Sequence, residues 1–134
     1  MDVLNLGNDI IFSEVKELNK ITSNYGLVLS DFEIRDLIDN KNCVLKNIGR
    51  IELDKSAVTL IIREFCKSSH ITSEEWVSTI NEIITLFYNV RNEIRDNVSD
   101  YDLVKFIYGV FENKVHGVVE LVYDEVMNEV NRYE

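Results

Sequence analysis

Length, composition and charge already restrict the class of protein. The chain has 134 residues, of which 46% are hydrophobic and 28% are charged. This length suits one domain, and the composition is that of a globular protein rather than a disordered or membrane-embedded one. No apolar run approaches the roughly 18 residues of a membrane span, and the N-terminal stretch MDVLNLGNDIIFSEV lacks the basic region of a signal peptide. We therefore expect a cytoplasmic protein with no membrane partner.

The charge balance is strongly acidic. Asp and Glu number 24 against 14 Lys and Arg, which gives a formal net charge of -10. Nucleic acids are bound mainly through Lys and Arg that neutralise phosphates, so the sequence predicts no nucleic-acid partner. An acidic surface that docks on a basic protein or mimics nucleic acid is the alternative to a charge that serves only solubility.

The two cysteines, Cys43 and Cys66, fit no metal-binding or redox spacing. In a cytosolic chain we expect both to be reduced and buried as small hydrophobic residues. Neither has a histidine directly beside it in the sequence, so a catalytic thiol lacks its usual support.

The N-terminal part predicts two helices whose ends are marked by caps and glycines, since the chain contains no proline. Apolar residues at helical spacing predict a first helix over 9–24, with either Ile21 or Thr22 on its buried face. Gly26 suits the left-handed position after the helix end. Ser30 and Glu33 then form a capping box that begins the second helix.

The second helix and the linker after it carry clear expectations about which side chains face solvent. On the helix, the polar residues expected to point outward are Asp36, Asp39 and Lys41. A short alternating stretch over 49–53 follows, which we interpret as an extended linker with Ile51 and Leu53 pointing into the core. Asp54 is expected to cap a third helix, up to about Lys67, that is apolar on most sides and buried between others.

The stretch from Thr72 to Asn97 predicts a long central helix over about 73–97. Its apolar residues recur at alternating spacings of four and three: Trp76, Ile80, Ile83, Phe87, Val90 and Ile94. Thr72 and Glu75 form the pattern of a capping box at its start. Such a helix would run about 40 Å at 1.5 Å per residue.

The C-terminal segment leaves two alternatives open. One is a single helix over 100–131, and the other is two helices, over 100–113 and 117–131, of which Ser99 caps the first. Gly117 costs a helix about 1 kcal/mol relative to alanine, and the residues before it are mostly polar, so we favour two helices. The elements together predict an all-α fold: one compact domain, 1–134, of five or six helices in a bundle-like or orthogonal array.

The candidate metal-site residues are Glu112, His116 and Glu120, each four residues after the last. On a continuous helix they share one face, and carboxylate and imidazole groups suit Zn, Fe or Mn or acid–base catalysis. Gly117 interrupts that helix, and neither H-E-x-x-H nor a repeated E-x-x-H is present. A plain solvated helix face is the favoured interpretation, and the sequence predicts no cofactor.

Three further residues are candidates for a role in binding. Arg50 and Glu52 flank Ile51 and are expected to project the same way. Arg50 either binds an anion or ties the linker to a helix C-terminus, and we favour the second. Glu52 is a further acid for the metal-site hypothesis. His70 is expected to be a turn residue.

Three short motifs resemble a known family. They are Tyr25-Gly26-Leu27-x-Leu29-Ser30, Gly49-Arg50-Ile51-Glu52 and Phe65-Cys66-x-Ser68-Ser69-x-Ile71. Together they resemble a family of small uncharacterised bacterial proteins with a domain of unknown function. The resemblance covers the first half of the chain. It implies a cytoplasmic protein and supplies no activity, cofactor or site.

The sequence contains no phosphate-binding loop, dinucleotide fingerprint or serine-hydrolase motif. Our leading hypothesis is a non-enzymatic helical protein that acts through protein–protein interaction or self-association. A homodimer through the C-terminal helices is expected, because the valine-rich final segment and the central helix offer more apolar surface than one small core absorbs. The alternative is a small metal-binding protein or enzyme that uses Glu112, His116 and Glu120.

Overall fold

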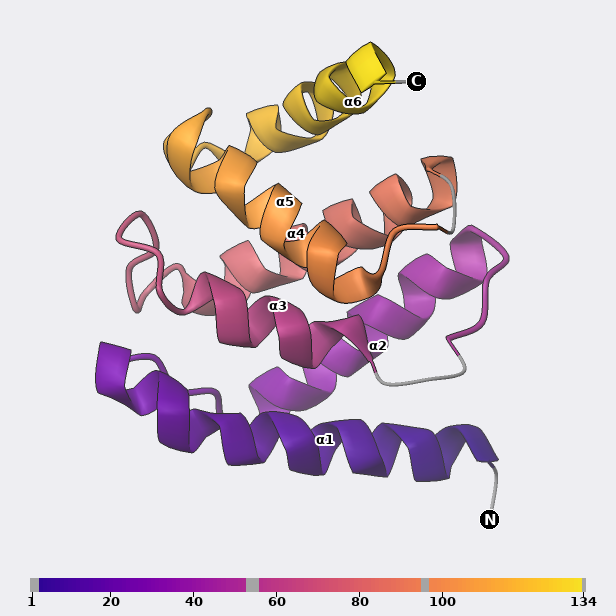
Figure 1. Cartoon of the computed structure of the whole chain (residues 1–134). Helices are drawn as coiled ribbons and strands as arrows, with labels where there is room; N and C mark the ends of the chain where they lie inside the picture. The colour runs from indigo at the N-terminus through magenta and orange to yellow at the C-terminus, as the bar shows by residue number, and fades with distance from the viewer. Residues whose placement is uncertain (1–2, 53–55, 95–96, 134) are drawn as a thin grey trace.

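A computed structural model describes residues 3–52, 56–94 and 97–133 (Figure 1). These residues form α-helices and short 3-10 helices without any strand, so the predicted all-α fold is confirmed. The α-helices are α1 (Val3–Thr22), α2 (Asp31–Asn47), α3 (Ala57–Phe65), α4 (Trp76–Glu93), α5 (Asp100–Asn113) and α6 (Val122–Tyr133). The 3-10 helices are η1 (Ser23–Tyr25) and η2 (Val119–Leu121). Within the described ranges, no helix has the length and apolarity required to cross a membrane.

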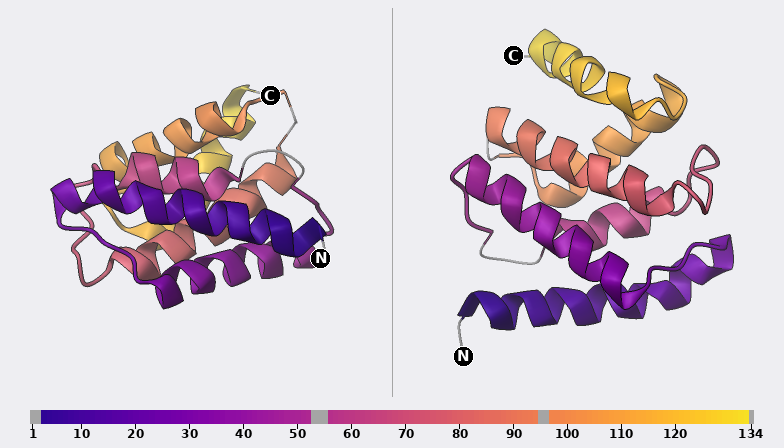
Figure 2. Two further views of the ribbon diagram at one scale, coloured as in Figure 1. Left: turned by 90° about the horizontal axis from the view of Figure 1, so that it is seen from below. Right: turned by 180° about the vertical axis from the view of Figure 1, so that it is seen from behind.

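The helices stack in layers from the N-terminal to the C-terminal end of the chain (Figures 1 and 2). α1 packs on one side against α2 and α3, α4 and α5 follow, and α6 lies on the opposite side of the molecule. α3 contacts α1, α4 and α5, which explains why it is apolar on most sides.

The buried apolar side chains form one continuous core through these layers. Its largest fully buried aromatic residues come from α3, α4 and α5, and they are Phe65, Trp76, Phe87 and Phe111. The core is therefore centred on these three helices, while α1, α2 and α6 cover it from outside.

Local capping patterns set several helix ends as predicted. The Ser30 Oγ accepts a hydrogen bond from the Glu33 N–H at 3.1 Å, and the Ser30 N–H donates to Glu33 Oε1 at 2.8 Å. The Ser99 Oγ accepts from the Asp102 N–H at 3.1 Å at the start of α5. Gly26 ends the first helical segment with a φ of 75°, a value that glycine adopts without strain.

The central helix is shorter than the predicted span of 73–97. α4 begins at Trp76 and ends at Glu93, so its 18 residues extend about 27 Å. The Thr72 Oγ1 does accept a hydrogen bond from the Glu75 N–H, at 3.3 Å. This contact closes a separate turn before the helix, and the Glu75 side chain makes no capping bond.

Two other helices begin at different residues from those predicted. α1 starts earlier, at Val3, and α3 starts at Ala57 with Ser56 as its capping residue. Asp54, the predicted cap of α3, lies outside the described residues. Leu53, which was predicted to point inward, lies outside them as well.

Three side chains lie on the opposite side from the prediction. Ile51, expected to point inward, is 77% exposed, because the linker directs Arg50 and Glu52 into the protein instead. Lys41, expected to face solvent, is buried against Glu52. Cys43, expected to be buried, is on the exposed side of α2.

The C-terminal segment contains a break, so the two-helix alternative is confirmed. α5 ends at Asn113 as predicted, but α6 begins at Val122 and not at the predicted residue 117, because Gly117 is left-handed, Val118 is extended and Val119–Leu121 form η2. The turn between them includes His116 at a φ of 50° and Gly117 at a φ of 84°. A Cβ atom on Gly117 would lie 2.4 Å from the Cβ of His70, so this turn packs directly against the turn between α3 and α4.

This close approach predicts that Gly117→Ala destabilises the protein more than other glycine substitutions do. We expect a loss of about 2–4 kcal/mol from the left-handed backbone and the overlap with His70. Gly26→Ala has a similar φ but open space around the new Cβ, and should lose only about 1–2 kcal/mol. Gly109→Ala, inside α5, should gain up to about 1 kcal/mol. Urea unfolding measures all three, and equal losses at Gly117 and Gly26 would contradict the close packing of the two turns.

Candidate functional site

The structure separates the three residues of the predicted metal site. Glu112 lies in the last turn of α5, His116 in the following turn and Glu120 in η2. Because α5 ends at Asn113, they do not share one helix face. In the part of the chain that the structure describes, no group of three or more His, Cys, Asp or Glu side chains is placed to hold a metal ion.

Glu112 instead connects two turns that are distant in the sequence. The Ser68 hydroxyl donates a hydrogen bond to Glu112 Oε1, and His70 Nε2 lies 3.9 Å from Glu112 Oε2. The same Ser68 oxygen accepts a hydrogen bond from the His70 N–H at 3.1 Å. His70 is thus a turn residue, as predicted, and its ring centroid lies 6.3 Å from that of His116. The arrangement fixes the α3–α4 turn to the end of α5.

The nearby thiol and phenol are held in their neutral forms. Burial raises the pKa of the Cys66 thiol, which disfavours the nucleophilic thiolate. Burial, together with the carboxylates of Glu112 and Glu64, raises the pKa of Tyr108 to about 12. Neither group is therefore activated for nucleophilic catalysis.

A second polar cluster lies inside the protein, where the linker before α3 meets α2 and α4. The Lys41 Nζ lies 3.1 Å from Glu52 Oε1, and the two side chains are only 6% and 11% exposed. The Tyr88 hydroxyl donates to Glu52 Oε2 at 2.6 Å, and the Ala57 N–H donates to the same oxygen at 3.3 Å. Burial, and then the adjacent Glu52 charge, raises the pKa of Tyr88 far above its ordinary value.

Two arginines extend this cluster toward the end of α4. The Arg50 Nη1 donates to the carbonyl oxygen of Arg91 at 3.4 Å, so Arg50 ties the linker to a helix C-terminus as predicted. The buried Arg91 donates from Nη2 to Asp100 Oδ1 at 2.8 Å, which connects α4 to the start of α5. Because Glu52 is already engaged by Lys41, Tyr88 and Ala57, the geometry favours a structural role over acid–base chemistry.

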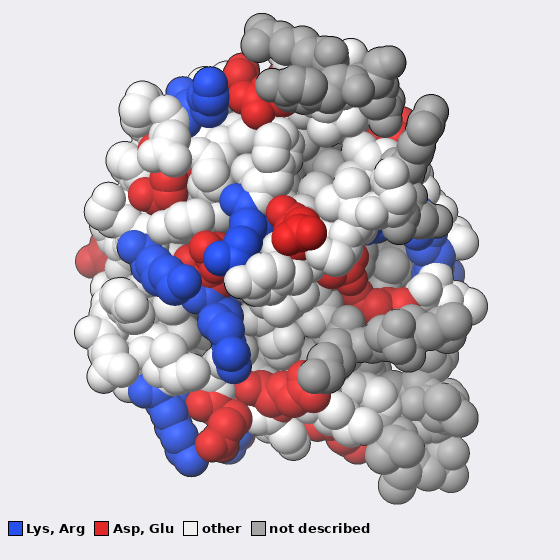
Figure 3. All heavy atoms as spheres, in the orientation of Figure 1, with Lys and Arg blue, Asp and Glu red and all other residues white. Residues whose placement is uncertain are grey.

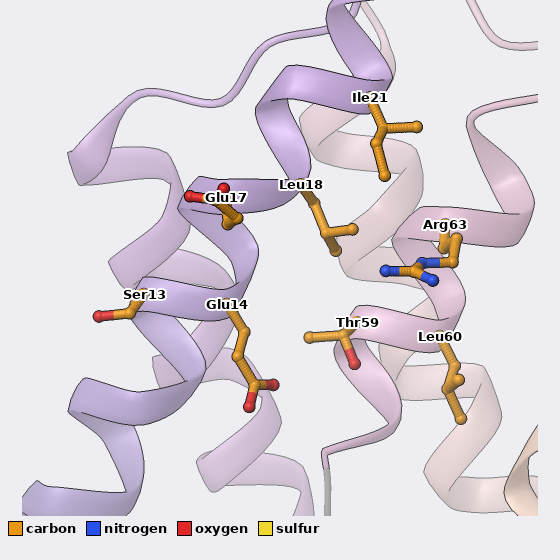
Figure 4. Close-up of a pocket in the computed structure, with 8 residues that line it drawn as sticks. All are labelled: Ser13, Glu14, Glu17, Leu18, Ile21, Thr59, Leu60 and Arg63. Atoms are coloured by element: carbon orange, nitrogen blue, oxygen red, sulfur yellow. The ribbon is translucent and has the colours of Figure 1, made fainter.

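A surface groove of about 570 Å³ runs between α1 and α3 (Figure 4). Its lining residues are Ser13, Glu14, Glu17, Leu18, Ile21, Thr59, Leu60 and Arg63. Figure 4 shows Glu14 and Arg63 directed into the groove from opposite walls, whereas Ser13 and Glu17 point away from it. Leu18 is buried at the α1 side, and Ile21 is 44% exposed.

The charges of the groove are only partly compensated. Glu17 forms an ion pair with Lys20 at 2.8 Å. The side chains of Glu14 and Arg63 make no ion pair or hydrogen bond with any residue that the structure describes. Figure 3 shows Lys and Arg side chains gathered over α3 and α5 with acidic ones among them, so this face is mixed in charge although the chain is acidic.

The sequence did not predict the groove, although the undecided orientation of Ile21 and Thr22 bears on it. The pattern of α1 left either Ile21 or Thr22 facing the core. Thr22 is only 2% exposed and occupies that place, which leaves the larger apolar Ile21 at the surface. The approach of Arg63 from α3 could not be read from α1 alone.

The buried cluster predicts that Glu52→Gln is strongly destabilising, because it keeps the shape and the acceptor oxygen but leaves the Lys41 ammonium buried without a counter-charge. We expect a loss of about 3 kcal/mol. The double variant Lys41→Met with Glu52→Gln should lose less than Glu52→Gln alone. The exposed pair offers a control: Glu17→Gln should cost below about 0.5 kcal/mol. If Glu52→Gln costs no more than Glu17→Gln in denaturant unfolding, the cluster does not hold the fold.

Alkaline titration should distinguish Tyr88 and Tyr108 from the other tyrosines. A tyrosine whose pKa is raised on folding stabilises the fold below pH about 10, where both states are neutral, and this contribution is lost as pH rises through the folded pKa. For Tyr108 we expect this stabilising contribution to be lost between pH about 10 and pH about 12. Tyr88 should stay neutral until the protein unfolds. In tyrosinate absorbance, Tyr88→Phe should leave the titration of the folded protein unchanged, and a reduced amplitude near pH 10 would contradict the Tyr88–Glu52 contact.

Comparison with known proteins gives one match. The model of a family of unknown function, DUF6323, matches residues 14–133, from α1 to α6. No curated protein and no solved structure matches the chain. The match includes both walls of the α1–α3 groove, the Glu52 cluster and Glu112, and extends the resemblance of the first-half motifs through the second half. The chain therefore belongs to DUF6323, a family of unknown function.

Proposed function

We propose that this protein is a non-catalytic binding protein and that it docks a protein partner in the α1–α3 groove. The observation that carries the proposal is the pair of uncompensated charges, Glu14 and Arg63, which extend from opposite walls into a groove that Leu18, Ile21 and Leu60 also line. Interfaces of proteins commonly combine a buried apolar centre with charged groups that fix orientation.

The shape of the groove supports a helical or globular protein segment as the ligand. It is open along two adjacent helices, α1 and α3, and an apolar strip between two helices is a common seat for an amphipathic helix. The exposed side chain of Ile21 supplies apolar surface at its edge.

The C-terminal helices are the other candidate docking surface. Val122 and Val126 of α6 are fully buried in the protein's own core, and the apolar side of α4 is buried as well. Among the described side chains of the last segment, Val118, Leu121 and Tyr123 are exposed, and Val115, Val119, Met127 and Val130 are partly exposed. The C-terminal homodimer expected from the sequence therefore stays a prediction.

The proposal includes a cytoplasmic setting in a bacterium and excludes nucleic acid as a partner. The unpaired state of Cys43 and Cys66 is compatible with a reducing compartment. The resemblance of the sequence motifs to small bacterial proteins supports the bacterial setting. The net charge of -10 supports the exclusion of nucleic acid.

The alternative of a metal-binding protein or enzyme also stays a prediction. It requires Glu112, His116 and Glu120 to converge, and hence a rearrangement of the turn after α5. The contacts of Glu112 with Ser68 and His70 oppose such a rearrangement.

Site-specific photocrosslinking in the source cell tests the proposed docking surface. With a photoreactive phenylalanine analogue in place of Ile21, we expect one adduct of defined mass. The same analogue in place of Phe32, which is 78% exposed on α2 and does not line the groove, is the matched control. No adduct at position 21, or equal adducts at both positions, would overturn the proposal.

A further inference from the structure

The charges of the groove restrict which partner can bind in it. We infer that the α1–α3 groove pairs with the same groove of a second copy of this chain, with Glu14 of each copy on Arg63 of the other. This inference rests on the proposed function and specifies its partner.

A two-fold arrangement satisfies both charges at once. In an isologous interface the same patch faces itself, so it must carry both halves of every contact. The groove does so, since it holds one uncompensated carboxylate and one uncompensated guanidinium on opposite walls. Consider a two-fold axis that lies in the interface, perpendicular to the line from Glu14 to Arg63 and level with its midpoint. Rotation about this axis places Glu14 of each copy over Arg63 of the other. α1 of one copy then lies over α3 of the other.

The overall charge of the chain makes this location selective. Two copies with a net charge of -10 repel one another across most of their surfaces. At the groove this repulsion is reduced, because Lys20 pairs with Glu17 and Arg63 adds a positive charge on the wall opposite Glu14. A uniformly acidic partner would oppose Glu14, and a uniformly basic one would oppose Arg63. A second copy opposes neither.

The apolar residues of the groove strengthen the same contacts. Leu18, Ile21 and Leu60 line the groove together with the two charged groups, and Figure 4 shows Leu18 and Ile21 extending from α1 toward α3. A second copy over the groove covers the exposed part of these side chains, and a contact between opposite charges is stronger where it is partly shielded from water. The interface thus combines apolar contacts beside the groove with two equivalent ion pairs.

Charge exchange in the full-length chain tests the inference by sedimentation equilibrium. The wild type should form a dimer. Arg63→Glu and Glu14→Arg should each weaken it at least about tenfold, because each places two like-charge contacts in the interface. The double variant should return to within about threefold of wild type, because both symmetric contacts are restored with reversed polarity. Lys46→Glu and Glu82→Arg, which change exposed charges outside the groove by the same amounts, should have little effect.

The outcomes separate this inference from the proposed function. A double variant that dimerises as weakly as the single variants, or a wild type that stays monomeric, overturns pairing with a second copy. If the position 21 adduct then contains a different protein, the groove remains a docking surface for that protein. If no position 21 adduct forms either, the proposed function fails as well. Circular dichroism of each variant establishes that it is folded before its association is compared.

Discussion

The carboxylate of Glu52 is the contact on which the arrangement of the helices most depends. It faces Lys41 of α2 and accepts hydrogen bonds from Tyr88 of α4 and from the N–H of Ala57 at the start of α3. Three helices and the linker therefore meet at one anion inside the protein. Such a cluster stabilises only when all its members are present, because removing one leaves a buried charge or polar group unpaired.

The contact at Glu52 and the one at Glu112 together fix α3 at both ends. Glu52 holds the residue that begins the helix, and Glu112 binds Ser68, which lies just after the helix ends. α3 is also the wall of the groove that carries Arg63. Two buried or half-buried carboxylates thus hold the stretch of α3 backbone from which Arg63 extends toward the groove.

The sequence predicted most of what depends on neighbouring residues and, apart from the tie of Arg50 to a helix C-terminus, missed what depends on distant ones. The Ser30–Glu33 capping box, the Ser99 cap and the break before Gly117 are local patterns, and the structure contains all three. The same local pattern at Thr72 misled, because a turn satisfies it as well as a helix does. Lys41 was expected to face solvent, because no residue near it in the sequence indicates a buried partner. Its partner Glu52 lies in the linker and contacts Lys41 because the linker directs the Glu52 side chain into the protein.

The candidate site shows the same division. The spacing of Glu112, His116 and Glu120 is a helical pattern, but it is meaningful only on a continuous helix, and α5 ends within it. The contact of Glu112 with Ser68 and His70 joins turns that lie far apart in the sequence, as does the approach of Arg63 to α1. No periodicity encodes such contacts. The α1–α3 groove therefore became visible only with the fold.

The central claim is that the α1–α3 groove is the interaction surface and that a second copy covers it. Hydrogen–deuterium exchange at low and high protein concentration tests this claim most directly. Exchange reports the opening of individual segments, so a contact between copies appears as protection that grows with concentration. The account predicts added protection in segments 13–21 and 59–63, with none in 118–131. Protection that appears in 118–131 instead, or in none of the three segments, would contradict it.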